Sequence, residues 1–407
     1  MKRGLVRVGL LIFLSFLLVL TPIVSACGGG ATEGAEIRIG VMGGQSAHAA
    51  SSVVPLLEEL EHIFRYINEV EGGIEGVKVN WRIVDNRGTP DGAVMAYKEL
   101  RDTFDPLLYL AVEDYLLLGI KDTLAEDESV VFTLSTINPQ GFLPPGRLFS
   151  TAIPTADGLA GFARWVLSDW KGSGKPKIGV LYWDLPSGQQ WRIAEAWIRN
   201  QGVDLVPTTF PITALDLKPQ LLSLRDAEVD YIWMLGLAHN AAVAIRDFRG
   251  LDLADKITFC FNEYTEADVV LDIVGPAAEG FYTYRSETPY SDGSQAAKLY
   301  SEIWKWATGE DKWSDNRILI TFKAALGAAV KQAVADVGWE DLDGEAVYNA
   351  LNKLTEIDTW GNSQGFGYGP GKRIGVSTVK MARFTKDGTV AVSEAVELPR
   401  IFEGVDK

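Results

Sequence analysis

The sequence contains few of the side chains that most often build metal centres and nucleophilic active sites. Among its 407 residues there are 3 histidines and 2 cysteines. The histidines, His48, His62 and His239, lie far apart in the chain, and the motifs H-E-x-x-H and C-x-x-C do not occur. We therefore expect a protein that is not an enzyme and that holds no metal ion and no cofactor.

Positive charge is also scarce. Lysine and arginine number 38 against 54 aspartates and glutamates, which gives a net charge of -16. Because such a surface repels phosphate groups, the composition argues against a nucleic-acid partner. An acidic surface favours solubility and does not by itself require a cationic ligand.

The amino-terminal segment has the three parts of a secretory signal. Lys2, Arg3 and Arg7 make its start positive, and residues 9–20 are apolar apart from one serine. The apolar run is shorter than the ~20 residues that a membrane helix needs. It leads into V-S-A-C, which ends at Cys27 and has the form of a lipidation box. The alternatives are a plain signal peptide with a chance cysteine, or an amino-terminal membrane helix.

A lipid on Cys27 would hold the mature protein to a membrane on its extracytoplasmic side. Residues 1–26 would be removed as the signal, and the glycine-rich residues 27–35 would form a flexible tether. Cys260 would then remain as a single thiol, which excludes an intramolecular disulfide. The protein must therefore draw its stability from its hydrophobic core.

Beyond residue 35 the sequence alternates between strand-like and helix-like segments. Such an alternation predicts an α/β fold with two parallel sheets. One predicted helix begins at Pro90 and has Thr89 as its predicted N-cap. The predicted strands cover residues 37–41, 77–85, 107–112, 130–134, 178–183, 204–210, 231–235 and 257–261. The other predicted helices between them cover residues 53–70, 155–170, 189–200, 217–227 and 238–249.

The last third of the chain has a different pattern. Helical spacing of apolar residues predicts helices over residues 295–308, 318–337 and 344–354. Two strand-like segments follow, at residues 376–384 and 390–396, on either side of a Lys-Asp-Gly turn. We interpret them as a closing antiparallel pair at the end of the chain.

An ordered series of short motifs resembles a known family. The motifs are I-N-E-V-E-G-G-I-E-G at residues 67–76, V-D-N-R-G-T-P at 84–90, S-T-I-N-P at 135–139, G-V-L-Y at 179–182 and A-A-E-G-F-Y at 277–282. Their order, together with the lipidation box, resembles type I periplasmic solute-binding lipoproteins. The class is that of the branched-chain amino acid (leucine/isoleucine/valine-binding) receptors of ABC transporters, and the likeness covers residues 36–400.

The resemblance implies a two-lobed α/β protein in which each lobe is a parallel-rich sheet flanked by helices. Lobe 1 would contain residues 36–151 and 285–368, and lobe 2 residues 152–284 and 369–407. The chain would cross between them three times, near residues 150–154, 282–286 and 366–377. Such a protein closes on a small polar or amphipathic ligand, an amino acid or a related compound, and then docks on the membrane permease of an ABC importer. The alternative is a lipoprotein ligand sensor of the same fold that signals to a membrane receptor.

The resemblance also suggests where the ligand would bind. Ser135, Thr136 and Ile137 fall in the loop that offers backbone N–H groups and hydroxyls to a ligand carboxylate in this family. Glu263 falls where amino-acid binders place the carboxylate that pairs with the ligand's ammonium group. The alternatives are a turn capped by serine and threonine in the first case and a solvated loop glutamate in the second.

Glu113, Asp114 and Tyr115 depart from the family pattern. They follow a predicted strand at a position where carboxylate binders carry small hydroxyl residues. Two acids there would repel a ligand carboxylate and would suit a cation or a polyol. Alternatively, one or both acids lie at a helix N-terminus, complement its dipole and face solvent. The identity of the ligand therefore stays open.

Further candidates are aromatic or hydrogen-bonding. Ser187 and Leu237 fall where the family often has aromatic residues over the ligand, and Trp183 and Tyr264 would supply an aromatic wall instead. Each of these aromatic residues could equally belong to the core or the rim.

The loop of residues 43–48 begins with Gly-Gly and lies at the mouth of the first predicted sheet. It lacks the G-x-x-x-x-G-K-[ST] pattern of a phosphate loop. We interpret it as a cleft loop in which Gln45 and Ser46 donate hydrogen bonds.

Overall fold

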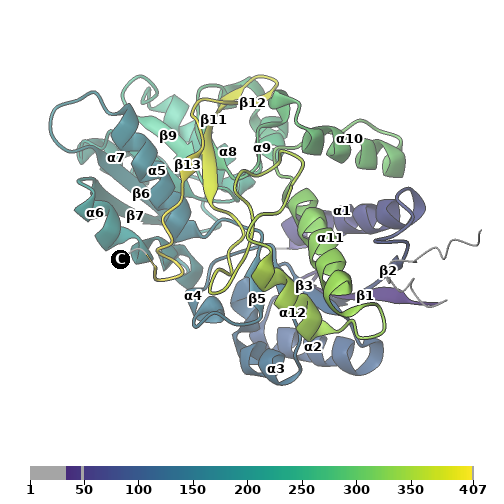
Figure 1. Cartoon of the computed structure of the whole chain (residues 1–407). Coiled ribbons are helices and arrows are strands. Elements are labelled where there is room, and N and C mark those ends of the chain that lie inside the picture. Colours follow the sequence, from purple (N-terminus) through teal and green to yellow (C-terminus); the bar gives the residue numbers. More distant parts are fainter. Residues whose placement is uncertain (1–33, 47–49, 406–407) are drawn as a thin grey trace, which may run out of the picture.

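The computed structural model describes residues 34–46 and 50–405, so the signal and the lipid site at Cys27 lie outside the described part of the chain. The described chain folds around two sheets, which we call the first and second lobes (Figure 1). Both sheets are parallel-rich and flanked by helices, as the sequence predicts. The two-lobed α/β fold is therefore confirmed.

The first sheet is entirely parallel. Its order is β2-β1-β3-β4-β5, and every neighbouring pair runs in the same direction. A three-residue strand, β5, is one that the sequence analysis missed. The strands are β1 (Glu36–Gly43), β2 (Lys78–Asp85), β3 (Leu108–Ala111), β4 (Val131–Thr133) and β5 (Leu148–Ser150).

Successive residues of the central strands of this sheet face different clusters. Leu108 and Leu110 of β3 belong to the cluster that includes buried residues of helices α1 and α11, whereas Tyr109 and Ala111 belong to the cluster that includes residues of α2 and η1. Helices therefore bury both faces of the sheet, as a parallel sheet requires. The helices of this lobe are α1 (Ala50–Glu69), α2 (Pro90–Phe104), η1 (Asp114–Ile120), α3 (Lys121–Glu126), α4 (Pro139–Phe142), α10 (Gln295–Thr308), α11 (Ile318–Val337) and α12 (Gly344–Lys353).

The second sheet mixes parallel and antiparallel pairs. Its order is β12-β11-β10-β9-β8-β6-β7, with β13 beside β11. Strands β6 to β10 pair in parallel, and β11 pairs antiparallel with β10, β12 and β13, which confirms the closing pair. The strands are β6 (Lys177–Trp183), β7 (Asp204–Phe210), β8 (Tyr231–Leu235), β9 (Thr258–Phe261), β10 (Tyr282–Arg285), β11 (Thr378–Thr385), β12 (Gly388–Ala391) and β13 (Val396–Glu397).

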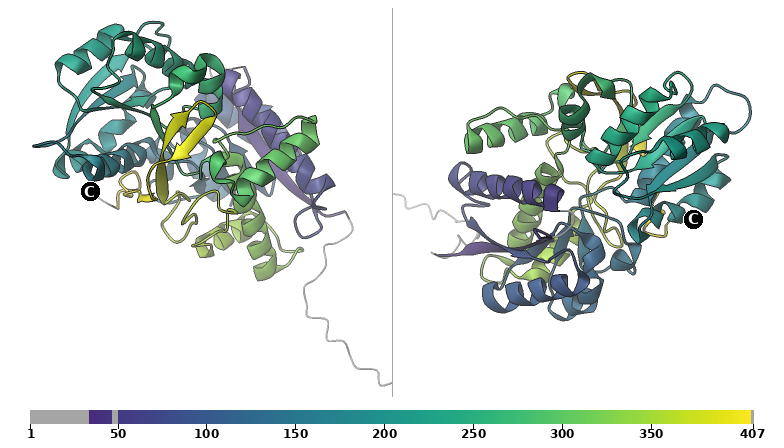
Figure 2. Two further views of the ribbon diagram at one scale, coloured as in Figure 1. Left: turned by 90° about the horizontal axis from the view of Figure 1, so that it is seen from above. Right: turned by 180° about the vertical axis from the view of Figure 1, so that it is seen from behind.

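Helices also cover both faces of the second sheet (Figure 2). Helix α5 contacts α6 and η2 on one side, and α8 contacts α7 and α9 on the other. The helical segments are α5 (Thr155–Asp169), η2 (Pro186–Ile193), α6 (Glu195–Asn200), α7 (Lys218–Asp226), α8 (Ala238–Gly250), α9 (Ala267–Val274), η3 (Gly275–Ala278) and η4 (Tyr290–Asp292).

One predicted helix is wrong over half its length. The sequence predicts a single α-helix over residues 189–200, but the chain forms the 3-10 segment η2 and then the short α6. Gly188 explains the tight turn, because a Cβ there would lie 2.0 Å from the carbonyl oxygen of Trp183. Its N–H donates to the carbonyl of Leu185 at 2.9 Å, which begins the tighter winding.

Three crossings join the lobes and lie against one another. The chain crosses between β5 and α5, between β10 and α10, and between α12 and β11. The first and third crossings are paired at Ser150. Its N–H donates to the backbone carbonyl of Arg373, and its carbonyl accepts from the N–H of Gly375, both at 2.8 Å. The second and third are paired where the N–H of Thr288 donates to the carbonyl of Asn362 at 2.7 Å.

Arg317 ties these crossings together from a fully buried position. Its Nε donates to Asn362 at 3.1 Å, and its two terminal nitrogens donate to the carbonyls of Ser314 and Thr288. The carboxylate of Asp315 lies 3.9 Å away and balances its charge. The exact lobe boundaries remain a prediction.

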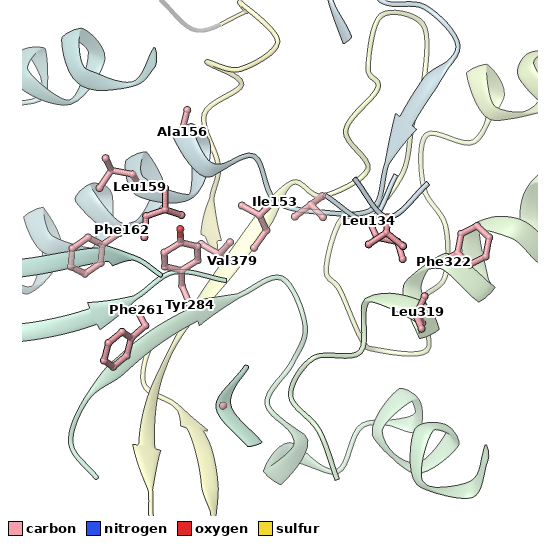
Figure 3. Packing of buried hydrophobic residues seen from close by; sticks show 14 of the residues in the cluster. Leu134, Ile153, Ala156, Leu159, Phe162, Phe261, Tyr284, Leu319, Phe322 and Val379 are labelled. Carbon is pink, nitrogen blue, oxygen red and sulfur yellow. The ribbon is translucent and has the colours of Figure 1, made fainter. Parts of the chain in front are cut away.

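The hydrophobic core runs through both lobes. Ile153, on the first crossing, lies between Tyr284 of the second lobe and Leu134 of the first (Figure 3). Helix α11 is long and apolar enough to span a membrane, but most of its apolar window is buried against the rest of the protein, with Phe322 fully enclosed. We assign it as a core helix. Cys260 on β9 is buried as a free thiol.

Candidate ligand-binding site

A cavity of about 370 Å³ lies between the lobes, at the carboxyl ends of strands from both sheets. This is where loops and helix N-termini of parallel α/β sheets converge. Its lining residues are Ser52, Val53, Leu56, Val112, Glu113, Tyr115, Leu134, Ser135, Ile137, Ala152, Ile153, Trp183, Leu185, Ser187, Ile212, Thr213, Leu237, His239, Glu263, Tyr264, Glu266, Arg285, Ser286, Glu287, Asn316 and Ile318.

The lining brings together most of the residues that the sequence suggested. They come from the ends of β3, β4, β6, β8 and β9, which are distant in the chain and adjacent in the two sheets. Those present are Glu113, Tyr115, Ser135, Ile137, Trp183, Ser187, Leu237, Glu263 and Tyr264.

Four other candidates, Gln45, Ser46, Asp114 and Thr136, are not among the described residues that line this cavity. Gln45 and Ser46 are exposed, and both donate hydrogen bonds to the carboxylate of Asp85. The N–H of Gln45 lies 3.0 Å and the hydroxyl of Ser46 2.6 Å from its oxygens.

Thr136 has a local role, which favours the reading of this loop as a capped turn. Its side chain is fully buried and its hydroxyl is hydrogen-bonded to the hydroxyl of Ser150, within reach of the carbonyl of Ala152 at 3.3 Å. The hydroxyl is therefore engaged inside the protein, beneath the first crossing.

Asp114 is buried, so the interpretation that it faces solvent is wrong. One carboxylate oxygen accepts from the N–H groups of Ile137 and Asn138, both at 2.8 Å, and the other accepts from the hydroxyl of Ser135 at 2.7 Å. The same hydroxyl accepts from the N–H of Asp114 at 2.9 Å. Burial raises the pKa of Asp114, and these three donors oppose that rise.

Glu113 is buried beside it and has its own partners. The N–H of Gly44 and the side-chain amide of Asn86 each donate to one of its carboxylate oxygens, at 3.1 Å in both cases. Burial is the main cause that raises its pKa, and the two donors act against it. The alternative of a solvent-facing acid is therefore wrong for Glu113 as well.

Glu263 differs from both of these acids. It is 9% exposed, and neither of its carboxylate oxygens has a hydrogen-bond partner among the described residues. Burial raises its pKa to about 7, although the nearby hydroxyl of Tyr284 and the charge of Arg285 lower it. The alternative of a solvated loop glutamate is wrong. An unpartnered buried carboxylate is costly and marks a place where a ligand could bind.

Arg285 is the most important residue that the sequence analysis missed. It ends β10, is 4% exposed and lines the cavity. One terminal nitrogen donates to the carbonyl of Thr265 at 2.9 Å, while its Nε has no partner in the described part of the chain. The signal in the sequence is a basic residue directly after a short strand-like Tyr-Thr-Tyr, a segment that the family resemblance places at a crossing.

Two more glutamates line the cavity and were not predicted. Glu266 accepts from the side-chain amide of Asn316 at 3.1 Å, and this bond joins the two lobes. Glu287 lies on the second crossing, is buried and accepts from the hydroxyl of Ser286 at 3.1 Å. Burial raises the pKa of Glu266, with the charge of Asp268 adding to the rise.

The remaining wall is apolar and aromatic. Trp183 is buried and donates from its indole nitrogen to the hydroxyl of Ser187 at 3.0 Å, which fixes the ring at the end of β6. Val53 and Leu56 of α1 and Ile153 of the first crossing also line the cavity. Among the residues that the structure describes, no group of histidine, cysteine and carboxylate side chains could hold a metal ion. The site therefore offers an apolar pocket with a few polar groups.

Comparisons with known proteins show the family and the fold. Residues 36–389 match the family described as periplasmic binding protein. No curated protein sequence matches the chain.

Solved structures are similar in fold. One is a branched-chain amino acid ABC transporter protein from Thermus thermophilus with bound valine, at 18% identity and a TM-score of 0.77, covering 91% of this chain and 98% of that one. A fatty acid ABC transporter substrate-binding protein from Thermomonospora curvata has 18% identity, a TM-score of 0.75 and coverages of 93% and 96%. A solute-binding protein from Rhodopseudomonas palustris BisB5, in complex with 3,4-dihydroxybenzoic acid, has 16% identity, a TM-score of 0.71 and coverages of 90% and 99%.

Proposed function

Because the chain belongs to the periplasmic binding protein family, we propose that it is the solute-binding receptor of an ABC importer. The ligand is a small amphipathic molecule that binds between the lobes. The observation that carries this proposal is the buried carboxylate of Glu263, a residue of the cavity lining, which has no hydrogen-bond partner among the described residues.

The arrangement of the lobes supports a binding cycle by hinge closure. Wall residues come from both sheets, and three adjacent crossings connect them. A ligand that contacts both walls binds the closed form better than the open form, and it shifts the population accordingly. Closure then presents both lobes together to the membrane permease, which releases the ligand when it separates them.

The apolar wall supports an amphipathic ligand. Residues such as Leu56, Ile153 and Trp183 offer nonpolar contact, while Glu263 and Arg285 offer charge. The similar proteins include ones solved with valine and with 3,4-dihydroxybenzoic acid, both small molecules with an apolar body and polar ends.

The signal and lipidation box support an extracytoplasmic location. We propose that a lipid on Cys27 anchors the mature protein and that residues 27–35 act as its tether. A receptor held in this way stays close to its permease, which raises its effective concentration there.

A ligand panel tests the proposal. Thermal unfolding of the chain lacking residues 1–27 would be followed with amino acids, amines, amides, polyamines and sugars. A compound present at 100 times its Kd adds about 2.7 kcal/mol of stability, which shifts the melting temperature measurably. If no compound class changes the melting temperature or the tryptophan fluorescence, the proposal is wrong.

A matched pair of variants tests whether the ligand binds in the cavity. Glu263→Gln removes the buried charge, whereas Glu279→Gln removes an exposed glutamate of the same lobe. For an ammonium ligand, we expect a loss of well over tenfold in affinity for the first variant, since breaking a buried charge pair costs about 3–5 kcal/mol. Affinity should be unchanged in the second.

A further inference from the structure

The loop of residues 135–138 holds a cluster of hydrogen-bond donors that is already filled. Two backbone N–H groups, from Ile137 and Asn138, and the hydroxyl of Ser135 all donate to the carboxylate of Asp114. Converging N–H groups of this kind form a site for an anion. Asp114 is 1% exposed, so its carboxylate is enclosed in this position.

The filled cluster borders the ligand cavity. Ser135 and Ile137 both line it, as does Glu113, the neighbour of Asp114. A ligand carboxylate that approached this loop would meet an acid in place of free donors. The N–H groups of Ile137 and Asn138 and the hydroxyl of Ser135 are thus not free to bind a ligand anion.

The charges of the remaining wall favour a cation. Four carboxylates line the cavity, and Arg285 is the single arginine or lysine among the described residues that do so. Burial raises the pKa values of Glu263, Glu266 and Asp268, and the charge of Arg285 already offsets part of that rise in each acid. A ligand carboxylate would add another buried negative charge to this set, at a desolvation cost.

On the opposite lobe, Glu263 offers a position for a cation. Both of its oxygens are buried and have no hydrogen-bond partner in the described part of the chain. A ligand ammonium would supply hydrogen bonds and an opposite charge at once. The cavity of about 370 Å³ has room for about a dozen groups of the size of a water molecule, at about 30 Å³ each.

We propose that Asp114 is a specificity-determining residue that occupies the anion position of the first lobe from within the protein. The cavity therefore selects apolar amines that carry no carboxylate over the matching amino acids. This inference rests on the proposed function as a solute receptor and names the class of its ligand.

The test compares pairs of ligands that differ only in the carboxylate. Isothermal calorimetry on the full chain, solubilised in a mild detergent, would measure isoamylamine against leucine and 2-phenylethylamine against phenylalanine. We expect each amine to bind at least tenfold more tightly than its amino acid. An amino acid that binds as tightly as its amine, or more so, would overturn the inference.

Variants of Asp114 test its role directly. Asp114→Ser frees the donors of the loop, so the ratio of amine affinity to amino-acid affinity should fall by at least tenfold. Asp114→Asn keeps an acceptor and the shape of the side chain but removes the charge, and the ratio should fall by less. The ratio is the decisive readout, because a purely structural defect would weaken both ligands together.

The outcomes separate the inference from the function on which it rests. If Asp114→Ser does not fold, Asp114→Asn and the unmodified chain still decide the matter. An unchanged ratio in the folded variants contradicts the role of Asp114. Binding of sugars or amides, with neither amines nor amino acids bound, would overturn this inference and leave the receptor function in place. A chain that binds no compound of the wider panel would remove both.

Discussion

At the scale of single residues, Glu263 controls how the site responds to pH. Its carboxyl has a pKa of about 7 in the ligand-free protein because burial disfavours its charged form. A cationic ligand binds the charged form, so its affinity should fall as the pH drops below about 7. The nearby Arg285 and the hydroxyl of Tyr284 lower this pKa, and Glu287 raises it.

The pH dependence of binding can be measured by calorimetry between pH 5.5 and 8.5 with an aliphatic amine, which stays protonated throughout. We expect the affinity to fall about tenfold for each pH unit well below the pKa. In Glu263→Gln this dependence should disappear along with most of the affinity. An affinity that is flat across the range in the unmodified protein would contradict the assignment of Glu263.

The same carboxyl should lower the stability of the ligand-free fold at higher pH. Its pKa is raised in the folded state above an unfolded value near 4.5, so the folded state holds its proton longer. Its contribution to stability is therefore fully present below about pH 4.5 and is lost as the pH rises through about 7. Glu263→Gln should stabilise the ligand-free protein at pH 8 by up to about 3 kcal/mol and much less at pH 4.5.

Denaturant unfolding at the two pH values checks this prediction, with Glu279→Gln as the exposed control. A variant that is less stable than the parent at pH 8 would show that Glu263 has a structural partner in the folded protein. A gain in stability joined to a loss of binding is the expected signature of a residue kept for function.

Residue roles were only partly predictable from the sequence. Glu263 lines the cavity, as the family resemblance implied for this residue after a recognisable buried strand. Arg285 was missed because β10 is only four residues long and has no clear boundary in the sequence. The position of Asp114 depends on donors that lie more than 20 residues away in the chain, and no local pattern contains that information.

At the scale of elements, the start of α2 shows that local signals can be sufficient. Thr89 is the N-cap, and its hydroxyl accepts from the N–H of Gly92 at 3.0 Å. Thr89→Ala should lower the free energy of unfolding by about 1 kcal/mol, since one N–H at the helix start loses its acceptor. Glu99→Ala, on the exposed side of the same helix, should change it by less than about 0.5 kcal/mol.

Urea unfolding followed by circular dichroism checks the pair of variants. Equal stabilities for the two would mean that water replaces the cap at little cost.

Elements with such signals were predicted closely: α10 and α11 have the bounds expected from their apolar spacing. The three-residue β5 was missed because it is too short to show a period, and its partner β4 determines that it is a strand.

At the scale of the whole molecule, Arg317 holds the crossings in register. Its guanidinium is fully buried and bonds to segments from the second and third crossings. Arg317→Met should destabilise the fold by about 3 kcal/mol or more, because Asp315 and several carbonyls would lose their buried partner. Lys331→Met on α11 removes an exposed ion pair with Glu75 and should cost less than about 1 kcal/mol.

Thermal and denaturant unfolding of both variants measure the difference. If Arg317→Met is as stable as Lys331→Met, the crossings are held by their backbone hydrogen bonds alone.

The family resemblance of the sequence predicted three crossings, but the sequence could not predict the contacts of Arg317 with them. The groups that meet Arg317 lie up to 45 residues from it in the chain.

The proposed anchor is also tested on the whole protein. Cys27→Ala should prevent incorporation of labelled fatty acid and release the chain from the membrane fraction of the producing cell. A variant that remains in the membrane would indicate an uncleaved amino-terminal helix in place of the lipid. Replacement of the exposed Glu356 by alanine serves as a control that should retain the lipid.

The buried thiol of Cys260 has a practical consequence for following the binding cycle in real time. It is fully buried on β9 and burial raises its thiol pKa, so it should react slowly with alkylating dyes. When the chain is produced without residues 1–27, it has no second cysteine. A new cysteine at the exposed Leu185 on the cavity rim would therefore be labelled selectively, without removal of the native one. The labelled protein would become a fluorescent sensor that reports its own ligand.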